Sequence, residues 1–179
     1  TKTIVHNAPA RFAVYDWHRN QQPIREEGYA TDLIAAEAER VIAAREQDDR
    51  PFFLYVAFNA VHGPLNPPPS FAGDPDDPLA IRDAMLSRLD QAVGQISRAI
   101  DDHGFRDNTL FIFTNDNGPV LESMSKPFRG TKNTTFEGGV RQPAILRWPG
   151  HTQPGSIKEG MMFIADFFPT LITLAGVKH

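Results

Sequence analysis

PFFLYVAF, residues 51–58, is the stretch that decides the fold class. It is a nearly continuous apolar run, the pattern of a strand that is buried on both faces of an α/β sheet. Just before it, TDLIAAEAERVIAAR (residues 31–45) carries apolar residues at spacings of three and four, which predicts an amphipathic helix. Because the apolar stripe of such a helix needs a sheet to cover, residues 31–58 predict a helix packed on a strand.

The alternation of strands and helices extends in both directions from this unit. RFAVYD (11–16) and TLFIFTN (109–115) are predicted strands. Apolar residues recur between Ile81 and Ile100, so we predict a second long helix that ends at the turn signal HGF (103–105). Strand, helix, strand, helix, strand is the order that forms parallel sheets with right-handed crossovers. The prediction is therefore an α/β fold with a mainly parallel sheet flanked by helices.

Three other segments complete the predicted unit. Residues 59–79 hold six prolines and should form an irregular loop. PAILRW (143–148) is predicted to be a further strand. DFFPTLITLAG (166–176) is predicted to be a final helix, with Asp166 as its N-cap and Gly176 as its stop signal. No internal repeat or interdomain linker is visible, so one compact unit is expected.

Composition narrows the function classes. The 179 residues are 41% hydrophobic and 22% charged, as in soluble globular proteins. A net charge of -4 gives no basic surface for a phosphate backbone, so no nucleic-acid partner is expected. The apolar runs are too short to span a bilayer, so no membrane association is expected either. The absence of cysteine excludes disulfides, thiolate zinc sites and cysteine nucleophiles, and leaves both cytosol and periplasm open.

Polar residues follow two of the predicted strands where each strand ends. FNAVHGPL (58–65) follows one strand and TNDNGPV (114–120) follows another. In an open α/β sheet, ligands bind beyond the carboxyl ends of the strands, so both segments should open on the same rim. Asp116-Asn117-Gly118 has two interpretations: a plain turn, or part of a hard-cation site. His62 is likewise either a loop imidazole or a functional side chain.

SKPFRGTKNTTFEGGVRQP (125–143) is the third candidate segment. Its glycines would let the backbone and the cations approach an anion closely. Lys132 and Arg129 are either anion ligands or a solvated surface, and Glu137 either pairs with Arg141 or faces water. The cations of this segment are Lys126, Arg129, Lys132 and Arg141.

These motifs, in this order, resemble the type I sulfatases of the alkaline-phosphatase superfamily. The resemblance rests on AVHGPL, LDQAVGQI before DNTLFIFTNDNG, PFRGTKNTTFEGGVRQPAILRWPG and ADFFPTLITLAG. It extends from about Tyr29 onward and corresponds to the middle-to-late part of the catalytic domain. It implies part of an alkaline-phosphatase-like sandwich, and a protein that hydrolyses sulfate esters. A periplasmic or secreted location fits the resemblance.

The resemblance also implies roles for four side chains. Asp116 and Asn117 correspond to residues that bind a calcium ion, which prefers such oxygen donors. His62 and Lys132 correspond to the histidine and the lysine that contact the sulfate ester. Phosphatase relatives usually place a histidine beside the aspartate, so Asn117 favours the sulfate branch. For Lys126, Arg129 and Arg141 the expected role is to shape the loop.

The chain departs from the family pattern in its nucleophile. Sulfatases use a formylglycine made from the first residue of a C/S-x-P-x-R motif. The chain has no cysteine, and we expect none of its serines to begin S-x-P-x-R. The early pair of aspartates and the first Lys-x-His are not recognisable before residue 30. Residues 1–179 are thus predicted to be a partial catalytic domain that lacks its N-terminal, nucleophile-bearing half and its C-terminal subdomain.

Such a chain should be inactive by itself and should tend to associate through exposed sheet surface. It is interpreted as a fragment of a sulfatase. The alternatives are a chain that assembles with its other half, a non-catalytic anion-binding or scaffold relative, and a phosphate or phosphonate ester hydrolase of the same superfamily.

Overall fold

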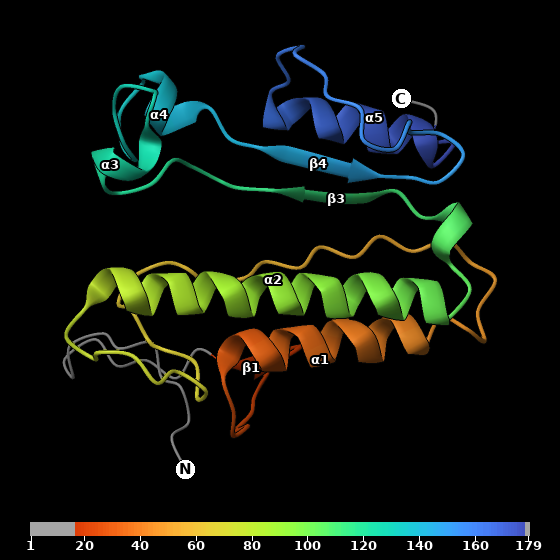
Figure 1. Ribbon diagram of the computed structural model, residues 1–179. Helices are drawn as coiled ribbons and strands as arrows, with labels where there is room; N and C mark the ends of the chain where they lie inside the picture. Colours follow the sequence, from red (N-terminus) through yellow and green to blue (C-terminus); the bar gives the residue numbers. More distant parts are fainter. Residues whose placement is uncertain (1–16, 178–179) are drawn as a thin grey trace.

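The computed structural model describes residues 17–177, which form a helical layer and a smaller layer of strands and short helices (Figure 1). The helical layer consists of α1 (Ala30–Ala43) and α2 (Pro78–Asp102). The other layer holds β3 (Phe111–Thr114) and β4 (Ala144–Arg147). Its helices are α3 (Glu122–Ser125), α4 (Glu137–Val140) and α5 (Phe167–Leu174). No helix in the described range is long and apolar enough to cross a membrane.

The two long helices are those that the apolar spacing predicts. Ala35, Ala38 and Ile42 of α1 meet an apolar stripe of α2, and small alanines on both sides let the helices approach closely. The buried residues that α2 contributes to this cluster are Ala92, Ile96, Ala99 and Ile100. Ile42 is fully buried. The predictions of helices at 31–45 and 81–100 are therefore confirmed, and α1 ends two residues earlier than expected.

Both ends of α2 are capped by local sequence. Asp77 is the N-cap, and its Oδ1 accepts hydrogen bonds from the backbone N–H groups of Leu79 (2.9 Å) and Ala80 (3.2 Å). Pro78 occupies the first turn, where its missing N–H costs nothing. At the other end, Gly104 has a φ of 78°, and the N–H of Phe105 donates to the carbonyl of Ile100 at 2.9 Å. The predicted stop at 103–105 is confirmed.

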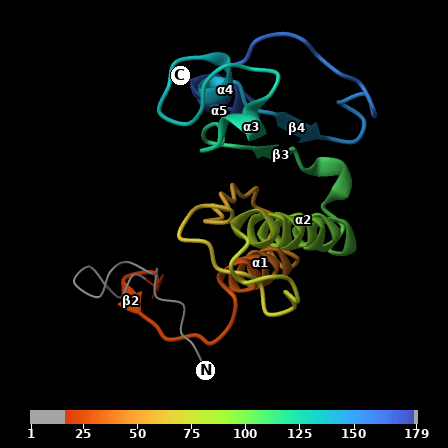
Figure 2. The same ribbon diagram turned by 60° about the vertical axis from the view of Figure 1, so that its left-hand side comes forward.

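Residues 51–58 are extended, but they are paired to no other strand within the described range. Their exposure alternates: Leu54, Val56 and Phe58 pack on the helical core, whereas Phe53 is 76% exposed and Tyr55 is 79% exposed. Within residues 17–177 the prediction of a strand buried on both faces is wrong, because only the face of Leu54, Val56 and Phe58 packs on the core. The run lies between the helices and β3 (Figures 1 and 2).

The strands predicted at 109–115 and 143–148 are confirmed as β3 and β4. They pair antiparallel, with Phe111 opposite Arg147 and Thr114 opposite Ala144. Among residues 17–177 no parallel ladder is present, so the predicted parallel sheet is not seen. Residues 51–58 and β3 nevertheless run in the same direction (Figure 1), so their carboxyl ends leave toward the same end of the molecule.

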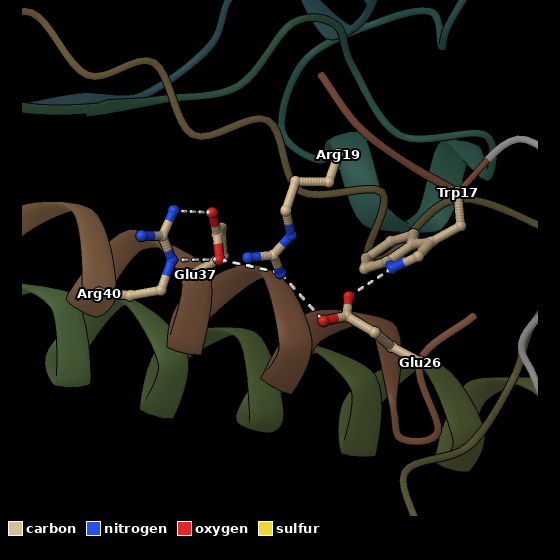
Figure 3. A network of polar contacts seen from close by, with 5 residues as sticks. All are labelled: Trp17, Arg19, Glu26, Glu37 and Arg40. Atoms are coloured by element: carbon tan, nitrogen blue, oxygen red, sulfur yellow. Dashed lines mark hydrogen bonds and ion pairs between the residues drawn. The ribbon is translucent and has the colours of Figure 1, made fainter. Parts of the chain in front are cut away.

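A short hairpin at the start of the described range is tied to α1 by charge. It consists of β1 (His18–Arg19) and β2 (Gln22–Pro23). The Arg19 guanidinium lies 3.0 Å from a Glu26 oxygen and 3.3 Å from a Glu37 oxygen (Figure 3). Arg40 binds Glu37 from the other side at 2.6 Å, and this hydrogen bond lowers the pKa of the Glu37 carboxyl. The strand predicted at 11–16 lies outside the described residues.

The loop and the last helix agree with the sequence in outline. No helix or strand interrupts residues 59–77, as predicted for the proline-rich loop. α5 ends at Leu174, and the predicted stop signal Gly176 follows it with a φ of 71°, while the Val177 N–H donates to the Ile172 carbonyl at 3.1 Å. Asp166 occupies the N-cap position of α5 as predicted, but its carboxylate accepts no hydrogen bond from the first turn of that helix. It accepts the N–H of Phe163 at 2.8 Å and thereby closes the preceding turn, Ile164–Asp166.

Candidate active site

The turn that follows β3 packs directly on α4. Gly118 is buried, and a Cβ atom there would clash with the carbonyl oxygen of Gly138. Its N–H donates to the carbonyl of Gly139 at 3.0 Å. Backbone can approach backbone this closely only where side chains are absent. The glycines therefore hold Asp116 and Asn117 against the 125–143 segment.

A second backbone contact brings Lys132 to the same place. The Lys132 N–H donates to the carbonyl of Pro119 at 2.8 Å, three residues after Asp116. The loop that carries Lys132 is closed by the Gly138 N–H, which donates to the Arg129 carbonyl at 2.8 Å. Two segments that are separate in sequence thus meet through their backbones, and between them they carry a carboxylate, an amide and an ammonium group.

The side chains at this surface are left without partners. Asp116 is exposed, and Asn117 and Lys132 are half-buried. Within residues 17–177, none of the three side chains takes part in a hydrogen bond or an ion pair. Elsewhere in the same part of the chain many acids do pair, as Asp32 does with Arg88 at 2.6 Å. The unpaired carboxylate and ammonium are therefore available for a ligand.

The donor chemistry at Asp116 and Asn117 suits a hard cation. A carboxylate and an amide oxygen are ligands that calcium prefers, but calcium takes about six to eight oxygens. In the part of the chain that the structure describes, no group of three His, Cys, Asp or Glu residues could hold a metal ion. The ligand types of Asp116 and Asn117 therefore suit calcium, but the two residues would supply only part of its coordination shell.

His62 lies at the start of the proline-rich loop and is exposed. Its Nδ1 is 2.6 Å from the carbonyl oxygen of Gly63. Since a carbonyl can only accept, Nδ1 carries a proton in this arrangement and Nε2 is free to meet a ligand. No hydrogen bond or ion pair within residues 17–177 joins His62 to Asp116, Asn117 or Lys132.

Both arginines of the 125–143 segment have structural partners. The Arg129 guanidinium lies 3.8 Å from the ring centroid of Phe136, and that of Arg141 lies 4.6 Å from Phe128. Arg141 also pairs with Glu137 at 3.2 Å, which confirms one of the two interpretations of Glu137. These stacked cations agree with the expected role of shaping the loop.

Sequence reasoning went wrong at Ser125. Residues 125–129, SKPFR, do have the spacing S-x-P-x-R, so the expectation that this motif is absent was mistaken. Ser125 is only 5% exposed, however, and its Oγ lies 3.0 Å from the carbonyl oxygen of Glu122 and 3.3 Å from that of Phe128. A hydroxyl buried against two backbone carbonyls closes a turn and does not face a ligand.

Thr134 is a residue that the sequence analysis passed over. Its Oγ1 lies 2.7 Å from the carbonyl oxygen of Thr131, on the other side of Lys132. A threonine shortly after an asparagine in a glycine-rich loop is a signal for a turn stabilised by a side chain, and could have been noticed.

Asp116 and Asn117 carry oxygen donors of the kind that hard cations prefer, and they lie on a turn whose backbone binds that of Lys132, a side chain of the kind that oxyanions prefer, in an α/β protein. The family model described as Sulfatase matches residues 2–177. The chain belongs to the sulfatase family.

Individual relatives agree with this assignment. The chain is 38% identical to N-acetylgalactosamine-6-sulfatase of Rattus norvegicus, over 85% of the chain and 30% of that protein. It is 42% identical to arylsulfatase A of Homo sapiens, over 78% of the chain and 28% of that protein. A crystal structure of Ps i-CgsB superposes with a TM-score of 0.82 at 31% identity, covering 89% of the chain and 37% of that structure. The chain thus spans about a third of the length of its relatives.

Proposed function

We propose that this chain is the middle-to-late part of the catalytic domain of a sulfuric ester hydrolase, and that the whole protein cleaves sulfate esters. The observation that carries the proposal is the backbone bond between Lys132 and Pro119, because it supports a site to which the turn of Lys132 and the turn of Asp116 and Asn117 both contribute. The nucleophile, a formylglycine in this family, would come from outside the described site. The 179-residue chain alone is then inactive.

Each of the four side chains has a part in this proposal. Asp116 and Asn117 would hold calcium through oxygen atoms, and calcium when bound supplies positive charge to the sulfate group. Lys132 offers its ammonium to a sulfate oxygen, where a fixed cation stabilises the negative charge that develops during transfer. His62 keeps Nδ1 on the Gly63 carbonyl, which orients Nε2 toward the ester.

We further infer that residues 51–58 belong to the mainly parallel sheet of an alkaline-phosphatase-like sandwich in the whole protein. Their common direction with β3 supports this inference. So do Phe53 and Tyr55, which expose an apolar face that a sheet protein would cover. The remainder of the catalytic domain is the natural cover for this face.

The proposal is tested with the intact protein and an aryl sulfate as substrate. Asp116→Asn keeps the side-chain shape and removes the charge. We expect it to lower both calcium affinity and turnover by more than about tenfold, since losing even an outer-shell partner of a metal ligand typically costs that much. Asp107→Asn is the control, because Asp107 is equally exposed and lies in the turn before β3.

Two results would contradict the proposal. One is full turnover of Asp116→Asn, or of the wild type after calcium is removed by a chelator. The other is a preference for phosphomonoesters over sulfate esters, which would assign the protein to the phosphatase branch.

A further inference from the structure

The hydroxyl of Thr134 closes the turn that carries Lys132. It accepts a hydrogen bond from the Thr131 N–H at 3.2 Å and donates one to the Thr131 carbonyl at 2.7 Å. The Thr134 N–H donates to the same carbonyl at 3.0 Å. Lys132 and Asn133 lie between these bonded residues, so the turn that carries Lys132 is closed by one side chain.

This turn needs such support because of Asn133. Its φ is 70°, in the left-handed region that residues other than glycine occupy at a cost. Such a conformation persists only where neighbouring contacts enforce it. The Thr134 hydroxyl supplies two of these contacts, and threonine is stiff at χ1 because it branches at Cβ.

Two glycines make room for the hydroxyl. A Cβ added at Gly130 would lie 2.6 Å from Thr134 Oγ1, and one added at Gly139 would lie 2.8 Å from it. The Gly139 carbonyl in turn accepts the N–H of Gly118, next to Asn117. The same hydroxyl therefore touches the loop of Lys132 and the backbone that adjoins the turn of Asp116 and Asn117.

We propose that Thr134 is a positioning residue that holds the turn of Lys132 against the turn of Asp116 and Asn117. This inference rests on the proposed function of Lys132. Without the hydroxyl, the Thr131 N–H loses its partner and the turn at Asn133 loses two of its bonds. Lys132 would then sample more orientations, and a misplacement of about 1 Å can cost roughly 100-fold in rate.

The neighbouring Thr135 offers a matched control. It is exposed, and within residues 17–177 its hydroxyl makes no hydrogen bond. In the intact protein, Thr134→Val should lower kcat/KM for an aryl sulfate by about 10- to 100-fold. Thr134→Ser keeps the hydroxyl and should restore most of this loss, and Thr135→Val should have no effect. Thr134→Ala removes the hydroxyl without adding bulk, in case valine prevents folding.

A double-mutant cycle shows whether Thr134 acts through Lys132. In a Lys132→Ala background, Thr134→Val should cause little further loss, because the group that it positions is already gone. A residue that merely stabilises the fold would cause its full loss in both backgrounds. The inference is overturned if the two effects add in full, or if Thr134→Val matches the wild type.

Hydrogen exchange gives a readout that does not depend on activity. Amides of residues 129–136 should exchange faster in Thr134→Val than in Thr134→Ser or Thr135→Val, with little change in α1 and α2. If the wild type hydrolyses no sulfate ester, the proposed function fails, and unchanged exchange in Thr134→Val would separately overturn the role of Thr134 in the turn.

Discussion

The helical layer and the layer of β3, β4 and α5 differ in how far their side chains are buried and paired. In the helical layer, Ala35 and Ile42 are fully buried, and Gln95 of α2 donates to Glu39 of α1 at 2.7 Å. In the layer of β3, β4 and α5, large apolar side chains are exposed to solvent: Ile145 is 60% exposed and Phe168 is 71% exposed. Lys132, in the same layer, has no acidic partner within residues 17–177.

This difference separates what stabilises the chain from what it offers to other molecules. The helical pair has its own core and its own polar partners, so its stability depends on residues within it. The upper layer presents unpaired charges and open apolar faces, which are features of surfaces that bind ligands or other protein segments. Substitutions in the two layers should therefore change different measured quantities.

The largest expected effect is on activity and comes from the upper layer. Lys132→Ala in the intact protein should lower kcat/KM for an aryl sulfate by about 100- to 1000-fold, the usual cost of losing a group that stabilises transition-state charge. The free energy of unfolding should hardly change, because within residues 17–177 the Lys132 side chain makes no hydrogen bond or ion pair that could be lost. Lys126→Ala is the control, being an exposed cation of the same segment. Equal losses in both variants would show that only general charge matters.

The second effect is on stability and comes from the helical layer. Ile42→Ala should lower the free energy of unfolding by about 2 to 4 kcal/mol, since it removes buried methyl groups and leaves a cavity. Leu86→Ala, at a position of α2 that is 53% exposed, should cost far less. Denaturant unfolding measures both. A cost at Leu86 equal to that at Ile42 would mean that the outer face of α2 is also covered in the intact protein.

A smaller effect is expected at the start of α2. Asp77→Ala removes the acceptor for two backbone N–H groups and should cost about 1 kcal/mol of stability. Asp76→Ala should be close to neutral, because within the described range the Asp76 side chain makes no hydrogen bond. Denaturant unfolding compares the two variants. Equal stabilities would mean that the Asp77 cap does not stabilise α2.

The smallest effect links the helical layer to the loop of His62. The Tyr29 hydroxyl donates to the Asn66 carbonyl at 3.0 Å, so Tyr29→Phe should cost up to about 1 kcal/mol. Burial raises the pKa of this hydroxyl above its ordinary value of 10.0. A raised pKa means that its contribution is complete below about pH 10 and is lost as pH rises through the folded-state pKa.

The stability of the wild type should therefore fall more steeply than that of Tyr29→Phe in the alkaline range. Thermal unfolding as a function of pH measures the difference between the two proteins. Tyr55→Phe, at a position that is 79% exposed, should keep the wild-type pH dependence. Parallel curves for wild type and Tyr29→Phe would show that the hydroxyl titrates as it does in water.

Local patterns predicted the helices well and the strand pairing poorly. The spacing of apolar residues located α1 and α2, and Gly104 and Gly176 marked where helices end. These signals act over a few residues, so they are visible in the sequence. The parallel pairing expected of residues 51–58 depends on segments far away in the chain, and the described ladder proved to be antiparallel.

The candidate site was predictable in its residues and not in its construction. Asp116, Asn117 and Lys132 stand out because their types suit a cation and an oxyanion. Their juxtaposition depends on Gly118 packing against Gly138, and nothing in the spacing of the sequence indicates that contact. Ser125 shows the opposite case. The S-x-P-x-R spacing is present in the sequence, but the serine is buried and its hydroxyl does not face a ligand.

The sequence by itself determined where helices form and end, which residues carry suitable chemistry, and the resemblance that the family match confirms. Only the tertiary structure decided that the Lys132 N–H binds the Pro119 carbonyl, that Thr134 spans the turn, and that one face of residues 51–58 is open. The physical reason is the separation in sequence over which each kind of interaction acts. Periodicity and caps act between neighbours in sequence, whereas the path of the backbone through space brings distant groups together.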